Sequence, residues 1–512
     1  MKWWTCLVIF CATAVLADED WLDVDTAQGP VRGRKHSSGQ LYEFYNIPYA
    51  TAPTGVDKFK APQPPPEWTD RFDAFGEENI IICPQYYNEM FVSFFPDEVV
   101  MQEECLVANV FVPVTTEDNL SVVVIVHGGA YVFGYGNMNK ATQLIEQEKD
   151  FIMVTFNYRL GVHGFLCLGT EDIPGNAGMK DQVALLRWVQ QNIASFGGNP
   201  DDVTLGGSSA GAASVDLLML SKSAEGLFHR VIPESGGSLA FLTESPLSIL
   251  KRGNYKKLPM LYGFAQMEGL FHIFFFDIWK NKMNEKFSDF LPADLEFESD
   301  AEREEVANKV RTFYFGYNLV DDDQVLKYID FFTDAIFAFP MLWSVKLQVE
   351  AGNDQVYLYE YSFADANSSK IPYTDMTGAT HCAQTAAWMD NGGDQNRDES
   401  LDTPEYKLMR KQVREMWHNF FKTGKPVPEG SSLPEWPAAQ ANRSPHMVLD
   451  EELTLGGVLL EDRIQLWEDI YQKHYRDAIP PRISGAGNMA PKNFFSLFAL
   501  YVIFGFTKRI LA

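Results

Sequence analysis

Residues 203–211 read VTLGGSSAG and join a short apolar run to an apolar segment that reaches Leu220. The last five of these residues fit the pattern Gly-x-Ser-x-Gly, in which a sharp turn between a strand and a helix exposes the central serine hydroxyl. Small neighbours are needed because the backbone is crowded and strained at such a turn. The helix that follows would favour negative charge developing beside the serine. The stretch therefore predicts a nucleophilic Ser209 at a strand-to-helix turn.

Buried strands and helices alternate around this turn. Residues 122–126 and 151–156 are continuous apolar runs, which are typical of strands buried on both faces. Residues 180–196 carry apolar side chains at helical spacing and stop at a glycine pair. Further elements are expected as strands at 203–205, 231–232 and 259–262 and as a helix at 210–220. This order predicts a mostly parallel central sheet with helices on both faces, where chemistry takes place at the carboxyl ends of the strands.

A glycine pair comes directly after the strand predicted at 122–126. The sequence there is His127-Gly128-Gly129-Ala130. By itself it is also typical of a glycine turn with a capping histidine. Paired with the serine turn, it favours an oxyanion hole, because glycines let backbone N–H groups approach a substrate oxygen. We expect Gly128, Gly129 and Ala210 to form that hole.

These motifs together resemble those of the type-B carboxylesterase and cholinesterase family. Phe196-Gly197-Gly198, four residues and then VTLGGSSAG are similar to its serine signature, and residues 103–110 resemble its second signature loosely. Other segments that look like family landmarks are Tyr45–Ala50, Asn157–Gly161, Asp181-Gln182 and Trp417–Phe420. The resemblance covers about Gln28 to Tyr471. It implies a carboxylesterase-like animal member with one α/β-hydrolase domain that splits carboxylic esters. The sequence contains no metal-ligand cluster, P-loop or dinucleotide fingerprint, so no cofactor is expected.

The resemblance also implies the order Ser, Glu, His for the catalytic residues. The acid of the family usually precedes a glycine a few residues beyond a strand, which Glu268-Gly269 matches. The histidine follows a Gly-x-x stretch, which residues 378–381 match at His381. His381 would take the proton of Ser209 and deliver it to the leaving alcohol. Glu268 would hold the imidazole and stabilise the imidazolium.

Two residue types depart from the family pattern. Ser208 stands where many active relatives carry an acidic residue. The histidine is followed by Cys382-Ala383-Gln384 where Gly-x-Asp or Gly-x-Glu is common.

The largest departure is the interval of 59 residues from Ser209 to Glu268, which is roughly 60 to 70 residues shorter than usual in the family. Residues 235–258 form a connection of 24 residues, which is longer than the dozen or so residues that a parallel crossover needs. The sheet should therefore form, with a shortened cap region between nucleophile and acid. The missing part resembles helices that wall the entrance to the active site, so we expect a wider and wetter site.

Presence of all three residues, Ser209, Glu268 and His381, favours an active serine carboxylesterase. Two alternatives stay open on the same scaffold, namely a non-catalytic adhesion or recognition relative and an inactive shortened isoform. Choline esters are disfavoured because residues 83–105 contain no Trp to bind a quaternary cation. Juvenile-hormone esters are disfavoured because their esterases commonly have Gln at the position of Ser208. A small-molecule carboxylic ester remains the expected substrate class.

The N-terminal residues 1–17 have the layout of a secretory signal peptide. A basic start and an apolar stretch lead to small residues at Ala14 and Ala17. The esterase domain would then occupy residues 18–484 of a secreted protein. Secretion permits disulfides, and Cys83 and Cys105 flank one loop, whose closure by a disulfide would remove about 3 kcal/mol of unfolded-chain freedom.

Three further features bear on the environment of the secreted chain. Cys167 follows an apolar stretch and is expected to remain a buried thiol. Asn119 and Asn367 begin glycosylation sequons. The formal net charge of −27 argues against nucleic acid or an anionic membrane as a partner.

The C-terminal residues 485–512 resemble a GPI-attachment signal. Small residues at 484–487 and a short polar spacer precede a 13-residue apolar run from Phe494 to Phe506, which is too short to span a bilayer upright. A tail helix packed on the domain and a tilted short anchor are alternatives. The expected protein is extracellular, and attached to the cell surface if the signal is used.

Treatment with phosphatidylinositol phospholipase C should release the protein from cells that make the full chain, because that enzyme cleaves the GPI lipid. The measurement is an immunoblot of the medium before and after treatment. A chain that ends at residue 484 is the control and should reach the medium without the enzyme. Full-length chain that stays with the cells after treatment would contradict the anchor.

Overall fold

The computed structural model describes residues 20–76, 80–85, 95–96, 98–237, 246–390 and 402–475. The predicted signal peptide and the predicted GPI signal lie outside the described residues. Within these ranges, no helix is long and apolar enough to cross a membrane.

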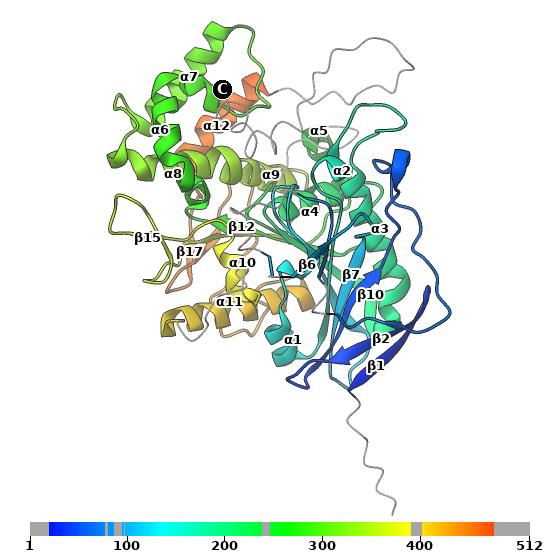
Figure 1. Ribbon diagram of the computed structural model, residues 1–512. Helices are drawn as coiled ribbons and strands as arrows, with labels where there is room; N and C mark the ends of the chain where they lie inside the picture. The colour runs from blue at the N-terminus through cyan, green and yellow to red at the C-terminus, as the bar shows by residue number, and fades with distance from the viewer. Residues whose placement is uncertain are drawn as a thin grey trace, which may run out of the picture.

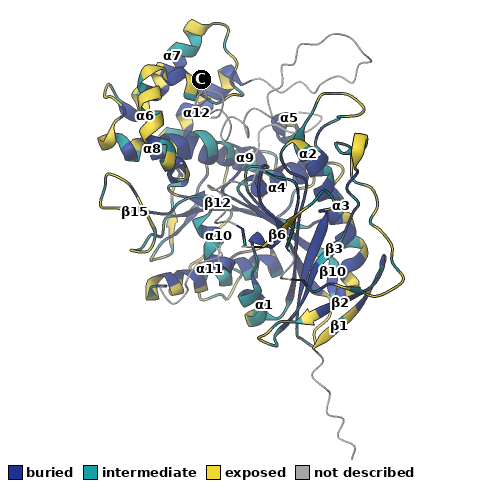
Figure 2. Cartoon of the chain, in the orientation of Figure 1, coloured by how far each residue is buried: buried dark blue, intermediate teal, exposed yellow. Residues whose placement is uncertain are grey.

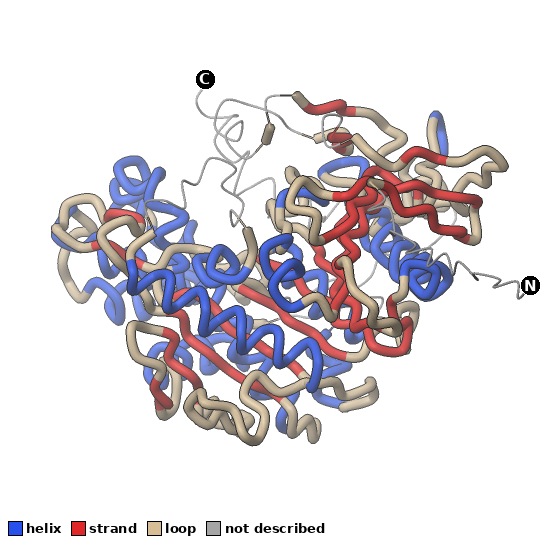
Figure 3. The backbone as a smooth tube through the Cα atoms, turned by 90° about the horizontal axis from the view of Figure 1, so that it is seen from below, coloured by secondary structure: helices blue, strands red, loops and turns tan. Residues whose placement is uncertain are grey.

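A mixed sheet, 13-stranded within the described ranges, runs through the middle of the molecule (Figures 1 and 3). Neighbouring strands in its centre are parallel, in the order β9 (Phe151–Phe156), β8 (Leu120–Val126), β10 (Gly198–Ser208), β11 (Arg230–Glu234), β12 (Met260–Ala265), β13 (Val356–Tyr361) and β16 (His446–Leu449). Antiparallel strands extend both edges, namely β1 (Trp21–Thr26), β2 (Gly29–Lys35), β3 (Leu41–Pro48) and β7 (Val107–Pro113) on one side and β17 (Thr454–Gly456) on the other. The predicted mostly parallel sheet is confirmed.

Helices cover both faces of the sheet, and its central strands are mostly buried (dark blue in Figure 2). Strands β8 and β9 are buried along their whole length. Successive side chains of a strand point to opposite faces. Val122 and Val124 of β8 belong to one hydrophobic cluster, together with α3 (Ala177–Asn192) and α4 (Ala210–Leu220). Val123 and Ile125 belong to another, with α1 (Thr142–Glu148) and α11 (Pro404–Thr423). A run of apolar residues without alternation is what burial on both faces requires.

A helical lobe is inserted between β12 and β13 (upper left in Figure 1). It contains η5 (Glu268–Phe275), α6 (Phe276–Glu285), α7 (Asp300–Phe315), α8 (Val325–Phe332) and α9 (Phe339–Glu350), and α12 (Glu461–His474) packs against it. Before the lobe, β11 and β12 pair in parallel, with α5 (Pro246–Arg252) between them. The short interval therefore still makes the expected crossover. Residues 238–245 of that interval lie outside the described residues.

A buried ion pair holds the segment after β9 against α3. The Arg159 side chain donates to both carboxylate oxygens of Asp181, at 2.8 Å from Nε and 2.6 Å from Nη2, and its backbone N–H also donates to Asp181. Arg159 Nη1 donates to the Lys58 carbonyl at 3.0 Å. The two side chains are only 3% and 0% exposed. Each charge therefore depends on the other for the interactions that water would provide.

Replacing Asp181 by Asn should lower the free energy of unfolding by about 3 to 5 kcal/mol, because it leaves the Arg159 charge buried without a counterion. The shift of the urea unfolding midpoint measures this effect. Glu225→Gln is the matched control, since it breaks an exposed pair with Lys222, and exposed pairs contribute about 1 kcal/mol or less. Equal shifts in the two variants would contradict a special role for the buried pair.

Candidate active site

Ser209 occupies a strained turn between β10 and α4. Its backbone has φ 56° and ψ −122°, a region that a residue with a side chain rarely adopts. The turn is tied down on both sides, because the Ser209 N–H donates to the Glu234 carbonyl at 2.9 Å and the Ser209 carbonyl accepts from Ala213 N–H at 3.1 Å. The serine is half-buried. The structure thus contains the strand-to-helix turn that residues 203–211 predicted.

Gly211 allows α4 to begin directly against the strand next to β10. A Cβ atom at Gly211 would lie 2.1 Å from the carbonyl oxygen of Val126 in β8, which is far inside van der Waals contact. The second glycine of Gly-x-Ser-x-Gly is therefore required by backbone-to-backbone packing. This packing brings the end of β8, and the loop that follows it, close to Ser209.

Glu268 and His381 form a buried hydrogen-bonded pair. Glu268 lies three residues past β12, and its Oε1 accepts the backbone N–H of Ala265 at 2.8 Å. Its Oε2 lies 2.5 Å from Nδ1 of His381. The side chains are 0% and 9% exposed. A carboxylate on Nδ1 holds the imidazole with Nε2 as the nitrogen left for proton transfer.

The residues around His381 raise its pKa and place aromatic rings beside the imidazole. Burial alone would lower the pKa of His381, but the adjacent Cys382 and the Glu268 carboxylate raise it above its ordinary value. Aromatic rings flank the imidazole, with centroid distances of 4.6 Å to Phe337 and 5.1 Å to Phe271. Among the described residues, no hydrogen bond joins the Ser209 hydroxyl to His381. Catalytic hydrogen bonds often tighten only when substrate binds.

The loop after β8 carries the two glycines predicted for the oxyanion hole. A Cβ atom on Gly128 would lie 3.2 Å from Cβ of Ser209, so this loop touches the serine turn. Nδ1 of His127 donates to the Gly128 carbonyl at 2.8 Å, and burial lowers the pKa of His127 to about 4, which keeps the ring neutral. Because a peptide unit is planar and trans, the Gly129 N–H points away from that carbonyl. Ala210 is the first residue of α4, so its N–H has no partner within the helix.

Gly129 has φ 103°, and a Cβ there would lie 2.0 Å from the carbonyl oxygen of Phe133. The tight turn of the loop therefore requires glycine. The structure pairs Glu268 with His381 and sets Gly128 against the Ser209 turn.

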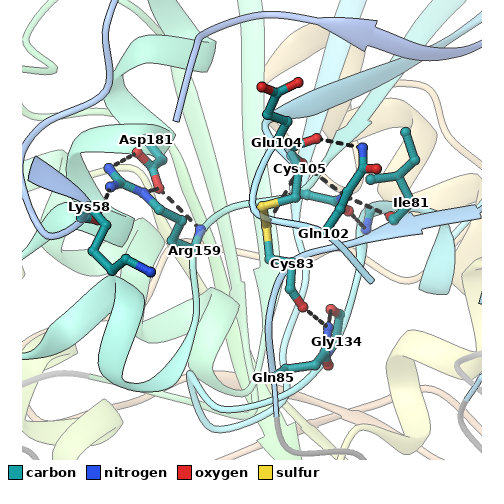
Figure 4. The surroundings of a disulfide bond; sticks show 12 residues. Lys58, Ile81, Cys83, Gln85, Gln102, Glu104, Cys105, Gly134, Arg159 and Asp181 are labelled. Atoms are coloured by element: carbon teal, nitrogen blue, oxygen red, sulfur yellow. Dashed lines mark hydrogen bonds and ion pairs between the residues drawn. A yellow bond between two sulfur atoms is a disulfide. The ribbon is translucent and has the colours of Figure 1, made fainter. Parts of the chain in front are cut away.

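The structure contains a disulfide between Cys83 and Cys105, as the sequence predicts. The residue that connects it to the site is Gln85, which pattern analysis did not identify (Figure 4). The Gln85 amide donates to the carbonyls of Cys83 and Gly134, each at 3.0 Å, and accepts the Gly134 N–H at 2.7 Å. Gly134 lies in the same loop as Gly129. The disulfide thus helps to hold the loop that carries the expected oxyanion donors.

Other predicted residues lie away from the site. Asn119 and Asn367 are exposed. Cys167 is half-buried, rather than fully buried as expected, because it lies in the loop after α2 (Gly161–Phe165), and its thiol donates to the Pro174 carbonyl at 3.5 Å. In the part of the chain that the structure describes, no cluster of three or more His, Cys, Asp or Glu side chains could hold a metal ion.

Glu268→Gln should lower the pKa of His381, because it removes the carboxylate that favours the imidazolium. A reduction of about 1 to 3 pH units is expected. NMR titration of ring-labelled histidine measures the pKa directly, and His418, which pairs with Asp150, serves as an internal control in the same spectra. An unchanged His381 pKa would mean that Glu268 does not stabilise the imidazolium.

Comparison with known proteins identifies the family. The model of the carboxylesterase family matches residues 21–241 and 237–467. The two matched ranges overlap at residues 237–241, which lie inside the short interval between Ser209 and Glu268. The carboxylic ester hydrolase of Bombus ignitus is 32% identical over 425 residues, which cover 67% of this chain and 75% of the relative. The para-nitrobenzyl esterase of Bacillus subtilis is 30% identical over 488 residues, covering 84% and 95%.

The solved structures agree with this assignment. The juvenile hormone esterase of Manduca sexta superposes with a TM-score of 0.78 at 27% identity, covering 88% of this chain and 100% of that one. Its fold is the α/β-hydrolase fold expected from the sequence. From the family match along most of its length, the chain belongs to the carboxylesterase family and is a carboxylic ester hydrolase.

Proposed function

We propose that the protein hydrolyses small-molecule carboxylic esters through an acyl-enzyme on Ser209, with His381 as general base and acid and Glu268 as its orienting carboxylate. The observation that carries this proposal is the buried contact of 2.5 Å between Glu268 and His381 Nδ1. Such a contact directs the free nitrogen Nε2 to proton transfer. The strained turn at Ser209 presents a hydroxyl at the same edge of the sheet.

Two half-reactions account for the chemistry. In the first, Ser209 Oγ attacks the ester carbonyl, its proton passes to His381 Nε2, and the imidazolium then protonates the leaving alcohol. In the second, His381 takes a proton from water, the hydroxide attacks the acyl-enzyme, and the proton returns to Ser209 as the carboxylic acid leaves. Glu268 stabilises the imidazolium in both steps.

The negative charge of each tetrahedral intermediate is proposed to rest on backbone N–H groups of Gly128, Gly129 and Ala210. Fixed donors of this kind need no reorganisation during reaction. One such donor lowers the activation free energy by about 3 to 4 kcal/mol. The hydrogen bond from His127 to the Gly128 carbonyl supports this, because it fixes the orientation of the Gly129 N–H. One relative, the Manduca sexta esterase, has been solved with OTFP covalently attached, which is consistent with covalent chemistry in the family.

The substrate is proposed to be an apolar ester in an extracellular setting. Rings of Phe271 and Phe337 flank His381 and would contact the groups next to the scissile bond. The Cys83–Cys105 disulfide and the exposed Asn119 and Asn367 sequons support secretion and glycosylation. The shortened cap is proposed to leave the entrance wide, so discrimination by chain length should be poor.

Ser209→Ala or His381→Ala should lower kcat for p-nitrophenyl acetate by about 10⁴-fold to 10⁶-fold. Labelling with a fluorophosphonate probe, which phosphonylates an activated serine with loss of fluoride, should be lost in Ser209→Ala. Ser208→Ala is the matched control and should keep the label, because only the neighbouring hydroxyl is removed. Label or turnover that persists in Ser209→Ala would overturn the proposed nucleophile.

A further inference from the structure

Glu234 is a buried carboxylate directly beneath the serine turn. It is the last residue of β11, where it pairs with Ser208 across the sheet. Its backbone carbonyl accepts the Ser209 N–H at 2.9 Å. The residue is 1% exposed, and among the described residues no ion pair involves it. A buried carboxylate without a counterion needs hydrogen bonds to every available lone pair.

Uncharged donors from three other elements supply these hydrogen bonds. Thr385 Oγ1 donates to Oε2 at 2.8 Å, and the Trp388 indole N–H lies 3.2 Å from both oxygens. The Trp417 indole N–H donates to Oε1 at 3.0 Å, and the Tyr359 hydroxyl lies 3.5 Å from the same oxygen. A carboxylate suits this set because it only accepts, whereas an amide would direct an NH₂ group at a donor.

Two of these donors belong to the helix that follows His381. This helix is α10 (Ala383–Trp388). Its first turn is hydrogen-bonded to the histidine loop, because Thr385 N–H donates to the Cys382 carbonyl at 3.0 Å and Ala383 N–H donates to the Thr380 carbonyl at 3.0 Å. A shift of the first turn of α10 would therefore shift His381.

A second contact joins the same two segments. The Gln384 amide in α10 donates to the Ser235 hydroxyl at 2.6 Å. Ser235 directly follows Glu234. The turn that carries Ser209 and the loop that carries His381 are thus connected through the end of β11, although 172 residues separate Ser209 from His381 in the chain.

We propose that Glu234 is a positioning residue for ester hydrolysis. Its backbone carbonyl is bonded to the Ser209 turn and its side chain is bonded to α10. Together these bonds set the distance over which the proton passes from Ser209 to His381. The inference rests on the proposed acyl-enzyme mechanism. Neither Glu234 nor Thr385 touches the reacting atoms. Their loss should therefore lower kcat and leave KM nearly unchanged, because substrate contacts stay while the geometry of proton transfer loosens.

The test compares two variants that each remove one donor from Glu234. Thr385→Val cuts the link to α10 with little change in volume, and Trp417→Phe removes a donor that lies on α11 instead. With p-nitrophenyl acetate, Thr385→Val should lower kcat by about 10-fold to 100-fold, with KM within about 2-fold. Trp417→Phe should keep kcat within about 2-fold of the parent even where its melting temperature falls further. Glu234→Gln should behave like Thr385→Val.

Each alternative outcome has a definite meaning. If kcat falls in both Thr385→Val and Trp417→Phe, and falls further in the variant whose melting temperature drops more, Glu234 supports only the fold and the inference is wrong. If Thr385→Val keeps the parent kcat, the link to α10 does not position His381 and the inference is also wrong. Ser209→Ala, assayed in parallel, separates these results from failure of the proposed mechanism, since only that failure would leave Ser209→Ala active.

Discussion

The positive φ of Ser209 is the constraint on which the active site depends. A conformation of this kind costs about 1 to 3 kcal/mol and persists only where the surrounding structure holds it. Here the backbone of Ser209 is bonded to Glu234 on the next strand and to Ala213 in the helix. Close contact of Gly211 with the Val126 carbonyl leaves the turn no room to relax. These contacts exist because β8, β10 and β11 are neighbouring strands buried on both faces.

The same sheet explains how the site tolerates a short interval between nucleophile and acid. Ser209 follows β10, and Glu268 follows β12, which pairs in parallel with β11. Parallel neighbours need only a crossover of a dozen or so residues to place both carboxyl ends at one edge. The pairing of Glu268 with His381 depends on that edge and on the loops after β12 and β13. The contact of Glu268 with His381 therefore forms with this short crossover.

The residue before the nucleophile is a serine, and the buried carboxylate next to it is that of Glu234 on the neighbouring strand. Many relatives carry an acid directly before the nucleophile, and this chain carries Ser208 there. Glu234 lies opposite Ser208 on the adjacent strand. Burial raises the pKa of Glu234 to about 7, and hydrogen bonds from Thr385, Trp388, Trp417 and Tyr359 oppose that effect. Two of these uncharged donors, Thr385 and Trp388, lie on the helix after His381.

The sequence alone determined the elements whose residues are uniformly apolar and the motifs that are local. The strand predicted at 151–156 and the helix predicted at 210–220 have the bounds of β9 and α4, because full burial and a glycine turn leave local signals. Residues 198–202 contain Gly, Asn, Pro and Asp, so β10 is longer than the predicted 203–205. The edge strands β1, β2 and β17 and the helical lobe were not predicted, since their faces are only partly apolar. Only the tertiary structure decided that Gln85 holds Gly134 and that Glu234 meets Thr385, 151 residues away, because a hydrogen bond between distant segments leaves no periodicity in the sequence.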